Sequence, residues 1–217
     1  MIDGEYVARM EDVLDLYERP YDSRYPLVCF DERPCQLLGN VKEPIPMKPG
    51  SPSKIDYHYK RNGTCSALVA CEPLRGWRTV IPSEQRTKRD YVQFMKELVE
   101  QEYPEADKVI VVQDNLNTHT AGAFYESFDA ETARKLARKL EFHFTPKKAS
   151  WLNMAEVEIS ALSKQCLDRR IGSREQLDRE IKRWVEYRNR ERAKIQWRFT
   201  TPQAREKLTR HYDAIWN

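Results

Sequence analysis

The sequence predicts an α/β fold in which helices flank a mixed sheet, and three features carry this prediction. Residues 108–112 are apolar and β-branched at nearly every position, which is typical of a strand buried on both faces. Residues 27–32 repeat this pattern. Residues 91–99 carry apolar side chains at the spacing of a helix, and this segment precedes the buried run at 108–112. A helix that leads into a buried strand indicates parallel strands covered by helices.

The segments before residue 53 are predicted as a helix, a strand and a loop. Apolar side chains recur at helical spacing within residues 5–18, so an amphipathic linker helix precedes the strand at 27–32. Between residues 44 and 52, four prolines exclude a helix and disfavour a central strand. We therefore expect an extended loop there.

Alternating patterns then return on both sides of an Asn-Gly pair. Residues 55–60 and 64–70 flank Asn62-Gly63, which predicts a hairpin turn at this pair. A further short strand is expected at residues 77–81. The next helix begins at a capping box that Thr87 opens.

The remaining elements complete the expected order of the chain. The patterns predict short helices at 118–127 and 130–140, a fifth strand at 141–145, a helix from about 155, a capped helix after Ser173 and a last helix at Thr201-Pro202. Antiparallel strands, a helix and then parallel strands is the order of a ribonuclease H-like fold. We expect a linker helix at 1–25, a catalytic core at 26–172 and a C-terminal helical extension of the same domain at 173–217.

Composition and charge fit one globular domain. The 217 residues are 40% hydrophobic, enough for one sizeable core. The net charge of +3 does not by itself indicate nucleic acid, but residues 182–198 hold seven basic and two acidic side chains. The basic excess therefore gathers near the C-terminus.

The cysteines and the apolar runs indicate a location. The five cysteines form no C-x-x-C pair, which favours free thiols in a reducing compartment and argues against a zinc site. No run approaches 18 apolar residues, and the first residues lack the features of a signal peptide. We expect a cytoplasmic, nucleoid-associated bacterial protein without a membrane partner.

Three acidic residues lie beside apolar segments, where burial of a charged side chain is costly. Asp31 and Asp114 each end an apolar strand, and Glu156 lies in the first turns of a helix. A strand-end aspartate is often a turn or cap residue. Clustered carboxylates, however, usually bind hard divalent cations such as Mg²⁺ or Mn²⁺. Two such ions would imply cutting or joining of phosphodiesters.

The words around these acids resemble a known family. V-C-F-D-E, V-V-Q-D-N-L-N-T-H and S-W-L-N-M-A-E are similar to the catalytic domain of mariner-like insertion-sequence transposases, above all the bacterial insertion sequence six-thirty family, from about Tyr6 to Tyr212. The resemblance implies a ribonuclease H-like fold and a catalytic, metal-binding triad of Asp31, Asp114 and Glu156.

The resemblance also implies cofactors and partners. These are two Mg²⁺ or Mn²⁺ ions, transposon terminal inverted repeats, target DNA and a second copy in a homodimer. The implied reaction is hydrolysis at the element ends followed by strand transfer. A helix-turn-helix region normally precedes this domain, and we expect an upstream partner region to supply it.

The residue-level alternatives remain open. Helical periodicity does not choose between Glu156 and Glu158, but the L-N-x-x-E spacing of the family favours Glu156 and leaves Glu158 to a salt bridge or a solvated face. Asn115 and His119 could orient a carboxylate, or they could satisfy the backbone at a turn.

The basic candidates have ordinary alternatives as well. Lys147 and Lys148 could meet a DNA phosphate or be exposed loop lysines. Arg188, Arg190 and Arg192, with aromatic residues among them, could form a DNA-backbone footprint or a solvated helix face. Two further functions also stay open: a nuclease without strand transfer, and a truncated DNA-binding or regulatory remnant.

Overall fold

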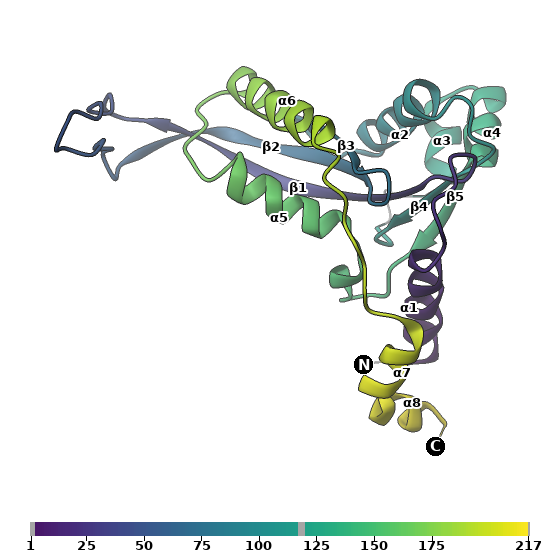
Figure 1. The fold of residues 1–217 in the computed structure, drawn as a ribbon. Helices are drawn as coiled ribbons and strands as arrows, with labels where there is room; N and C mark the ends of the chain where they lie inside the picture. Colours follow the sequence, from purple (N-terminus) through teal and green to yellow (C-terminus); the bar gives the residue numbers. More distant parts are fainter. Residues whose placement is uncertain (1–2, 117–119, 217) are drawn as a thin grey trace.

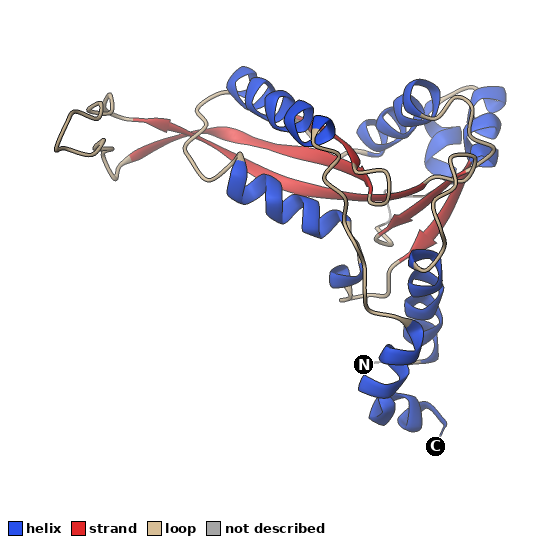
Figure 2. Ribbon diagram, in the orientation of Figure 1, coloured by secondary structure: helices blue, strands red, loops and turns tan. Residues whose placement is uncertain are grey.

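The computed structural model describes residues 3–116 and 120–216 and has a five-stranded sheet at its centre (Figures 1 and 2). The strands are β1 Leu27–Asn40, β2 Tyr59–Glu72, β3 Trp77–Ser83, β4 Val109–Gln113 and β5 Leu140–Phe144. They lie in the order β3-β2-β1-β4-β5. The β1, β2 and β3 strands pair antiparallel, whereas β4 pairs parallel with both β1 and β5. The predicted mixed sheet is confirmed.

Helices cover both faces of this sheet. Their bounds are α1 Gly4–Tyr17, α2 Lys88–Glu97 with a π-helical turn at Leu98–Glu102, α3 Gly122–Ser127, α4 Ala130–Lys139, a 3₁₀ turn at Ser150–Leu152, α5 Ala155–Gln165, α6 Arg174–Arg190, α7 Thr201–Lys207 and α8 Thr209–Trp216. Val28 and Phe30 pack with α2, α3 and α4, and Cys29 packs with α1 and the start of α5. Because successive strand residues point to opposite faces, Asp31 shares a face with α1 and α5, and Glu32 lies on the other face.

The predicted helix starts follow from local capping. The Thr87 and Asp90 side chains form the expected capping box at α2. At α6, the Ser173 side chain accepts from the backbone N–H of Gln176. Such caps satisfy backbone donors that no helical partner reaches, which is why they can be read from the sequence.

The β1 and β2 strands form one long arm that projects from the body of the molecule (Figure 1). Each strand has 14 residues, and the pairing runs from Cys29 opposite Cys71 to Asn40 opposite Tyr59. The proline-rich segment lies in the loop at the end of this arm, as predicted.

The hairpin turn predicted at Asn62-Gly63 is wrong. The β2 strand runs through both residues, and the pairing shifts there, between Leu37 and Leu38 of β1, as a β-bulge. The Asn62 amide donates to the backbone oxygen of Gly172 at 2.7 Å, and Gly63 has a φ of 122°. A long-range contact and an uninterrupted ladder thus override the local turn preference.

The helix predicted as a linker packs into the core. Met10, Val13 and Leu14 of α1 are fully buried. The α1 helix also contacts α7, where Arg205 forms a bidentate ion pair with Glu11. Both ends of the chain therefore lie at one end of the molecule (Figure 1). The boundaries at residues 25 and 172 remain predictions.

The cysteines and the helices also bear on the expected thiol state and on membrane spans. All five cysteines are free, and four of them are buried. Among the residues that the structure describes, no helix is both long and apolar enough to span a membrane.

Candidate active site

Asp31 and Asp114 lie level with each other on neighbouring strands. The parallel pairing of β1 and β4 ends with Cys29 beside Val112. Two residues further along each strand, the same register places Asp31 beside Asp114. Alternation sets Asp114 on the same face as Ile110 and Val112, which is also the face of Asp31. Although β4 ends at Gln113, one residue before Asp114, paired strands lie about 4.8 Å apart, and we infer that the two carboxylates lie near each other.

The charges around Asp31 indicate that the acids influence one another. Burial is the main cause that raises the pKa of Asp31 from 3.8 to about 6, and the negative charges of Glu156 and Asp114 raise it further. The backbone N–H of Glu32 donates to Asp31 Oδ1 at 2.7 Å and opposes this rise. The three acids named from the motifs are thus brought into one electrostatic neighbourhood.

Glu156 reaches this neighbourhood from the first turn of α5. The apolar side chains along one face of α5 are buried, from Ala155 through Ile159 and Leu162 to Cys166. Glu156 lies beside that face and is half-buried. Its backbone N–H donates to the oxygen of Asn153 at 3.0 Å, which starts the helix directly above β1.

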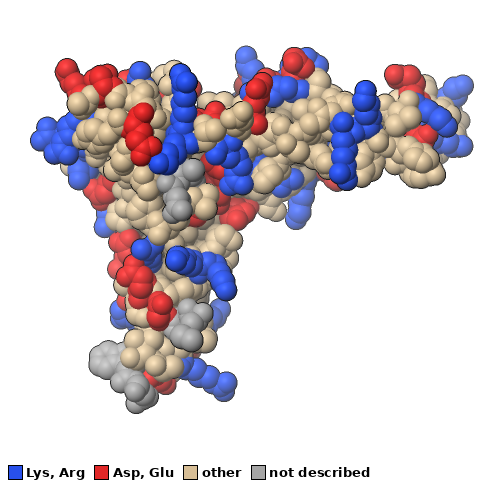
Figure 3. Space-filling view, turned by 180° about the vertical axis from the view of Figure 1, so that it is seen from behind, with Lys and Arg blue, Asp and Glu red and all other residues tan. Residues whose placement is uncertain are grey.

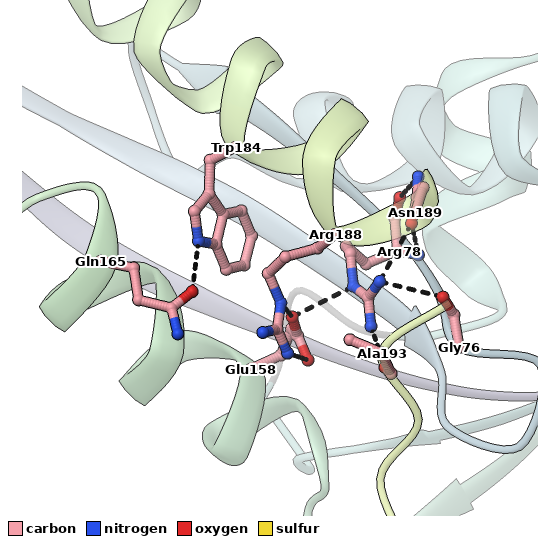
Figure 4. A network of polar contacts seen from close by, with 8 residues as sticks. All are labelled: Gly76, Arg78, Glu158, Gln165, Trp184, Arg188, Asn189 and Ala193. Carbon is pink, nitrogen blue, oxygen red and sulfur yellow. Dashed lines mark hydrogen bonds and ion pairs between the residues drawn. The ribbon is translucent and has the colours of Figure 1, made fainter. Parts of the chain in front are cut away.

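Glu158, the alternative acid, is completely buried and paired with two arginines (Figure 4). Arg188 Nε and Nη2 donate to its two oxygens at 2.6 and 3.2 Å, and Arg78 Nε lies 3.1 Å from Oε1. The salt-bridge alternative for Glu158 is confirmed. A buried carboxylate with two cationic partners is unavailable to a metal ion in this arrangement.

Arg78 extends this network to the segment after α6. Its guanidinium donates to the backbone oxygens of Gly76 and Ala193, while the Asn189 side chain bonds to both backbone polar groups of Arg78 (Figure 4). The network therefore joins α5, α6 and β3. Sequence reasoning missed Arg78, because an isolated arginine on a strand carries no pattern.

The residues expected to support the acids are placed in part. Asn115 is exposed directly after Asp114. His119 lies outside the described residues, so its expected role stays a prediction. Lys147 and Lys148 are exposed, and Lys148 has a φ of 64°. They follow Thr145, whose N–H donates to the oxygen of Gln113 at 2.9 Å, so both lysines lie near the end of β4.

The three arginines expected at DNA differ in their surroundings. Arg188 pairs with Glu158, and its side chain is only 17% exposed, so it contributes to the packing of α5 and α6, and its expected contact with DNA stays a prediction. Arg190 is exposed and stacks over Tyr187 at 5.4 Å. Arg192 is also exposed. Figure 3 shows basic and acidic side chains interspersed over one face of the molecule.

A cavity of about 820 Å³ lies elsewhere in the molecule. Its walls come from the end of α1, the N-terminal ends of β1 and β4, and residues 195–198. Asp31, Asp114 and Glu156 are not among its lining residues. The acids lie toward the other end of these strands, so this cavity is not the site that they define.

The donor set fits a hard divalent cation by its chemistry. Asp31, Asp114 and Glu156 offer only carboxylate oxygens, the ligands that Mg²⁺ and Mn²⁺ prefer. Across residues 3–116 and 120–216, however, no three His, Cys, Asp or Glu side chains are arranged closely enough to hold one metal ion together. The chain thus supplies suitable ligands in one neighbourhood, but not a closed coordination shell.

Comparison with solved structures identifies similar folds. A Mos1 mariner paired-end complex with Mn shares 18% identity and a TM-score of 0.59, with 100% of this chain covered and 63% of that chain. A Mos1 strand transfer complex shares 16% identity and a TM-score of 0.60, with 97% and 60% covered. At such identities the likeness shows the fold. The chain spans less than two thirds of the length of these transposases.

Comparison with known sequences identifies the family. No curated protein matches the chain. The model of the DDE superfamily endonuclease family matches residues 26–178, which include β1, β4, α5 and the three acids that they carry. On this match and the ribonuclease H-like sheet, the chain belongs to the DDE superfamily endonucleases.

Proposed function

We propose that this chain is the catalytic domain of a transposase, which hydrolyses phosphodiesters at the ends of a transposable element and joins the resulting 3′-hydroxyl to target DNA. The observation that carries this proposal is the approach of Asp31, Asp114 and Glu156 from three separate elements within a DDE endonuclease fold.

The cofactor is proposed to be two Mg²⁺ or Mn²⁺ ions held by Asp31, Asp114 and Glu156. A bound pair of such ions would supply a nucleophilic oxygen and stabilise the charge that develops on the phosphate. The chain itself presents the carboxylates on the interior strand β1, directly after the interior strand β4 and at a helix start, which limits their motion. One of the similar structures is named as a complex with Mn, which supports a divalent ion here.

The proposed partners are transposon terminal inverted repeats, target DNA and a second copy of the chain. One similar structure is named as a Mos1 transposase paired-end complex with the left transposon end and another as a Mos1 strand transfer complex, which supports DNA as the partner. Exposed Lys147, Lys148, Arg190 and Arg192 are proposed to contact DNA phosphates. An upstream helix-turn-helix region would recognise the transposon ends. The reaction would take place at the bacterial nucleoid in the cytoplasm.

The test is a joining assay with a matched set of variants. A labelled duplex that ends in the inverted repeats flanking the coding region is incubated with supercoiled plasmid and Mn²⁺. Wild type is expected to join the duplex to the plasmid, while Asp114→Asn, checked for folding by circular dichroism, is expected to be inactive. Glu131→Gln replaces an exposed acid on α4 and serves as the control.

The outcomes separate this proposal from its alternatives. Plasmid nicking that Asp114→Asn abolishes, without joined product, would indicate a nuclease that lacks strand transfer. Neither product from folded wild type would indicate a remnant that binds DNA without cutting it. Full activity of Asp114→Asn would contradict the assignment of the acids.

A further inference from the structure

We propose that Asn153 is a positioning residue that fixes the Asp31 carboxylate relative to the helix start that carries Glu156. This inference rests on the proposed function, because it concerns the same three acids. In this role the Asn153 side chain orients the Asp31 carboxylate, and it is neither an acid or base in the reaction nor a ligand of the metal ion.

Asn153 is placed between two of the elements that carry the acids. It lies between the 3₁₀ turn and α5, and it is only 1% exposed. Its Nδ2 donates to the backbone oxygen of Phe30 at 2.7 Å and approaches Asp31 Oδ2 at 3.3 Å. Its Oδ1 accepts from the backbone N–H of Ala155 at 3.1 Å. One amide thus ties β1 at Asp31 to the residue before Glu156.

The hydrogen bonds leave Asn153 little freedom. Both of its amide hydrogens have acceptors on β1, and its oxygen has a donor on α5. The flanking backbone is also held, since the Tyr17 hydroxyl donates to the oxygen of Leu152 at 2.7 Å and lies 3.4 Å from the N–H of Met154. The buried amide is therefore held in place before any ligand arrives.

The same contacts orient the Asp31 carboxylate. The N–H of Glu32 binds Oδ1, and the Asn153 amide faces Oδ2. Two donors on the two oxygens restrict rotation of the carboxylate about its last bond.

The test compares two asparagine variants with similar chemistry. Asn153→Ser keeps a side-chain acceptor for the helix start but loses the amide donor to β1. The control is Asn189→Ser. Asn189 also joins a helix to a strand, since it donates to the backbone oxygen of Arg78 at 2.8 Å and accepts from its N–H at 2.9 Å, but it lies in the network of Figure 4, away from Asp31.

The readout is Mn²⁺ binding to the full chain without DNA, measured as the loss of the free-ion signal in electron paramagnetic resonance. Residues that orient metal ligands typically change metal affinity by about 10- to 100-fold. Asn153→Ser is therefore expected to raise the dissociation constant for Mn²⁺ at least about tenfold. Asn189→Ser is expected to lower the melting temperature about as much as Asn153→Ser does. Its Mn²⁺ affinity, however, is expected to stay within about twofold of wild type.

Asn153→Asp provides a second, independent variant. It preserves the side-chain shape and the acceptor for Ala155, and its added negative charge would by itself favour a cation. We still expect weaker Mn²⁺ binding than in wild type, because the new carboxylate faces the Phe30 oxygen and Asp31 without an amide donor.

The outcomes distinguish this inference from the proposed function. Wild-type affinity in either folded Asn153 variant, or an equal loss in Asn189→Ser, would overturn the positioning role while leaving the metal site intact. Absence of Mn²⁺ binding in wild type would instead refute the metal site, and the positioning role with it.

Discussion

Replacing Asp31 with asparagine is expected to stabilise the metal-free protein at pH 8. The structure raises the pKa of Asp31 from 3.8 to about 6, chiefly through burial and then through the charges of Glu156 and Asp114. A shift of about two pKa units corresponds to about 3 kcal/mol of folding free energy that the ionised form loses. Asparagine offers one acceptor oxygen to the two donors that face Asp31, the Glu32 N–H and the Asn153 amide, so one donor loses its partner and we expect a net gain of about 1 to 3 kcal/mol.

The gain must depend on pH with a definite sign. A carboxyl whose pKa is raised by folding favours the folded state below pH 4, and this contribution is lost as the pH rises through about 6. The stability difference between Asp31→Asn and wild type should therefore be largest above pH 7 and shrink toward pH 4. Urea denaturation at several pH values, in buffers that contain a chelator, measures this difference directly.

Two results would refute this reasoning. One is a variant that is less stable than wild type at pH 8, and the other is a stability difference that does not change between pH 8 and pH 5. Either result would mean that burial and the neighbouring acids do not raise the pKa of Asp31 in the folded protein. Most substitutions of buried polar residues destabilise a protein, so a gain in stability is a specific outcome.

Three further predictions concern the fold and the DNA contacts. Glu158→Gln should cost about 3 to 5 kcal/mol in urea denaturation, because it leaves two buried arginines without their anion, and a loss below about 1 kcal/mol would contradict the network. Gly76→Ala should lower thermal stability by about 1 to 3 kcal/mol, because Gly76 has a φ of 73° and a Cβ would lie 2.5 Å from the Arg192 oxygen. Gly122→Ala has room and is expected to be neutral or stabilising in the same melting experiment. Lys147→Ala should weaken DNA binding for all sequences in fluorescence anisotropy. It should also reduce the slope of log affinity against log salt concentration by about 1, and an unchanged slope would exclude a phosphate contact.

The elements with local causes could be predicted from the sequence. The buried run of β4, the apolar stripe of α5 and the cap at Thr87 each depend on residues within a few positions of one another. The apolar runs that precede Asp31 and Asp114 were predictable for the same reason, although Asp31 does not end its strand as expected, because β1 continues to Asn40 through its pairing with β2. Parallel pairing of those strands then brings the two acids together.

The features with distant causes could not be predicted. The Asn62-Gly63 pair has a strong local preference for a turn, but its partners are the β1 strand and Gly172, more than 100 residues away. Glu158 and Arg188 are 30 residues apart and meet only after α5 and α6 pack together. Charge patterns on a single helix cannot reveal such a partner, so the ion pair between Arg188 and Glu158 could not be predicted.

The most direct test of the central claim is a calorimetric Mn²⁺ titration of wild type, Asp114→Asn and Glu156→Gln. The account predicts binding by wild type that both substitutions weaken, because the three acids contribute to one site. Binding that neither substitution changes would contradict the claim that Asp31, Asp114 and Glu156 form a shared metal site.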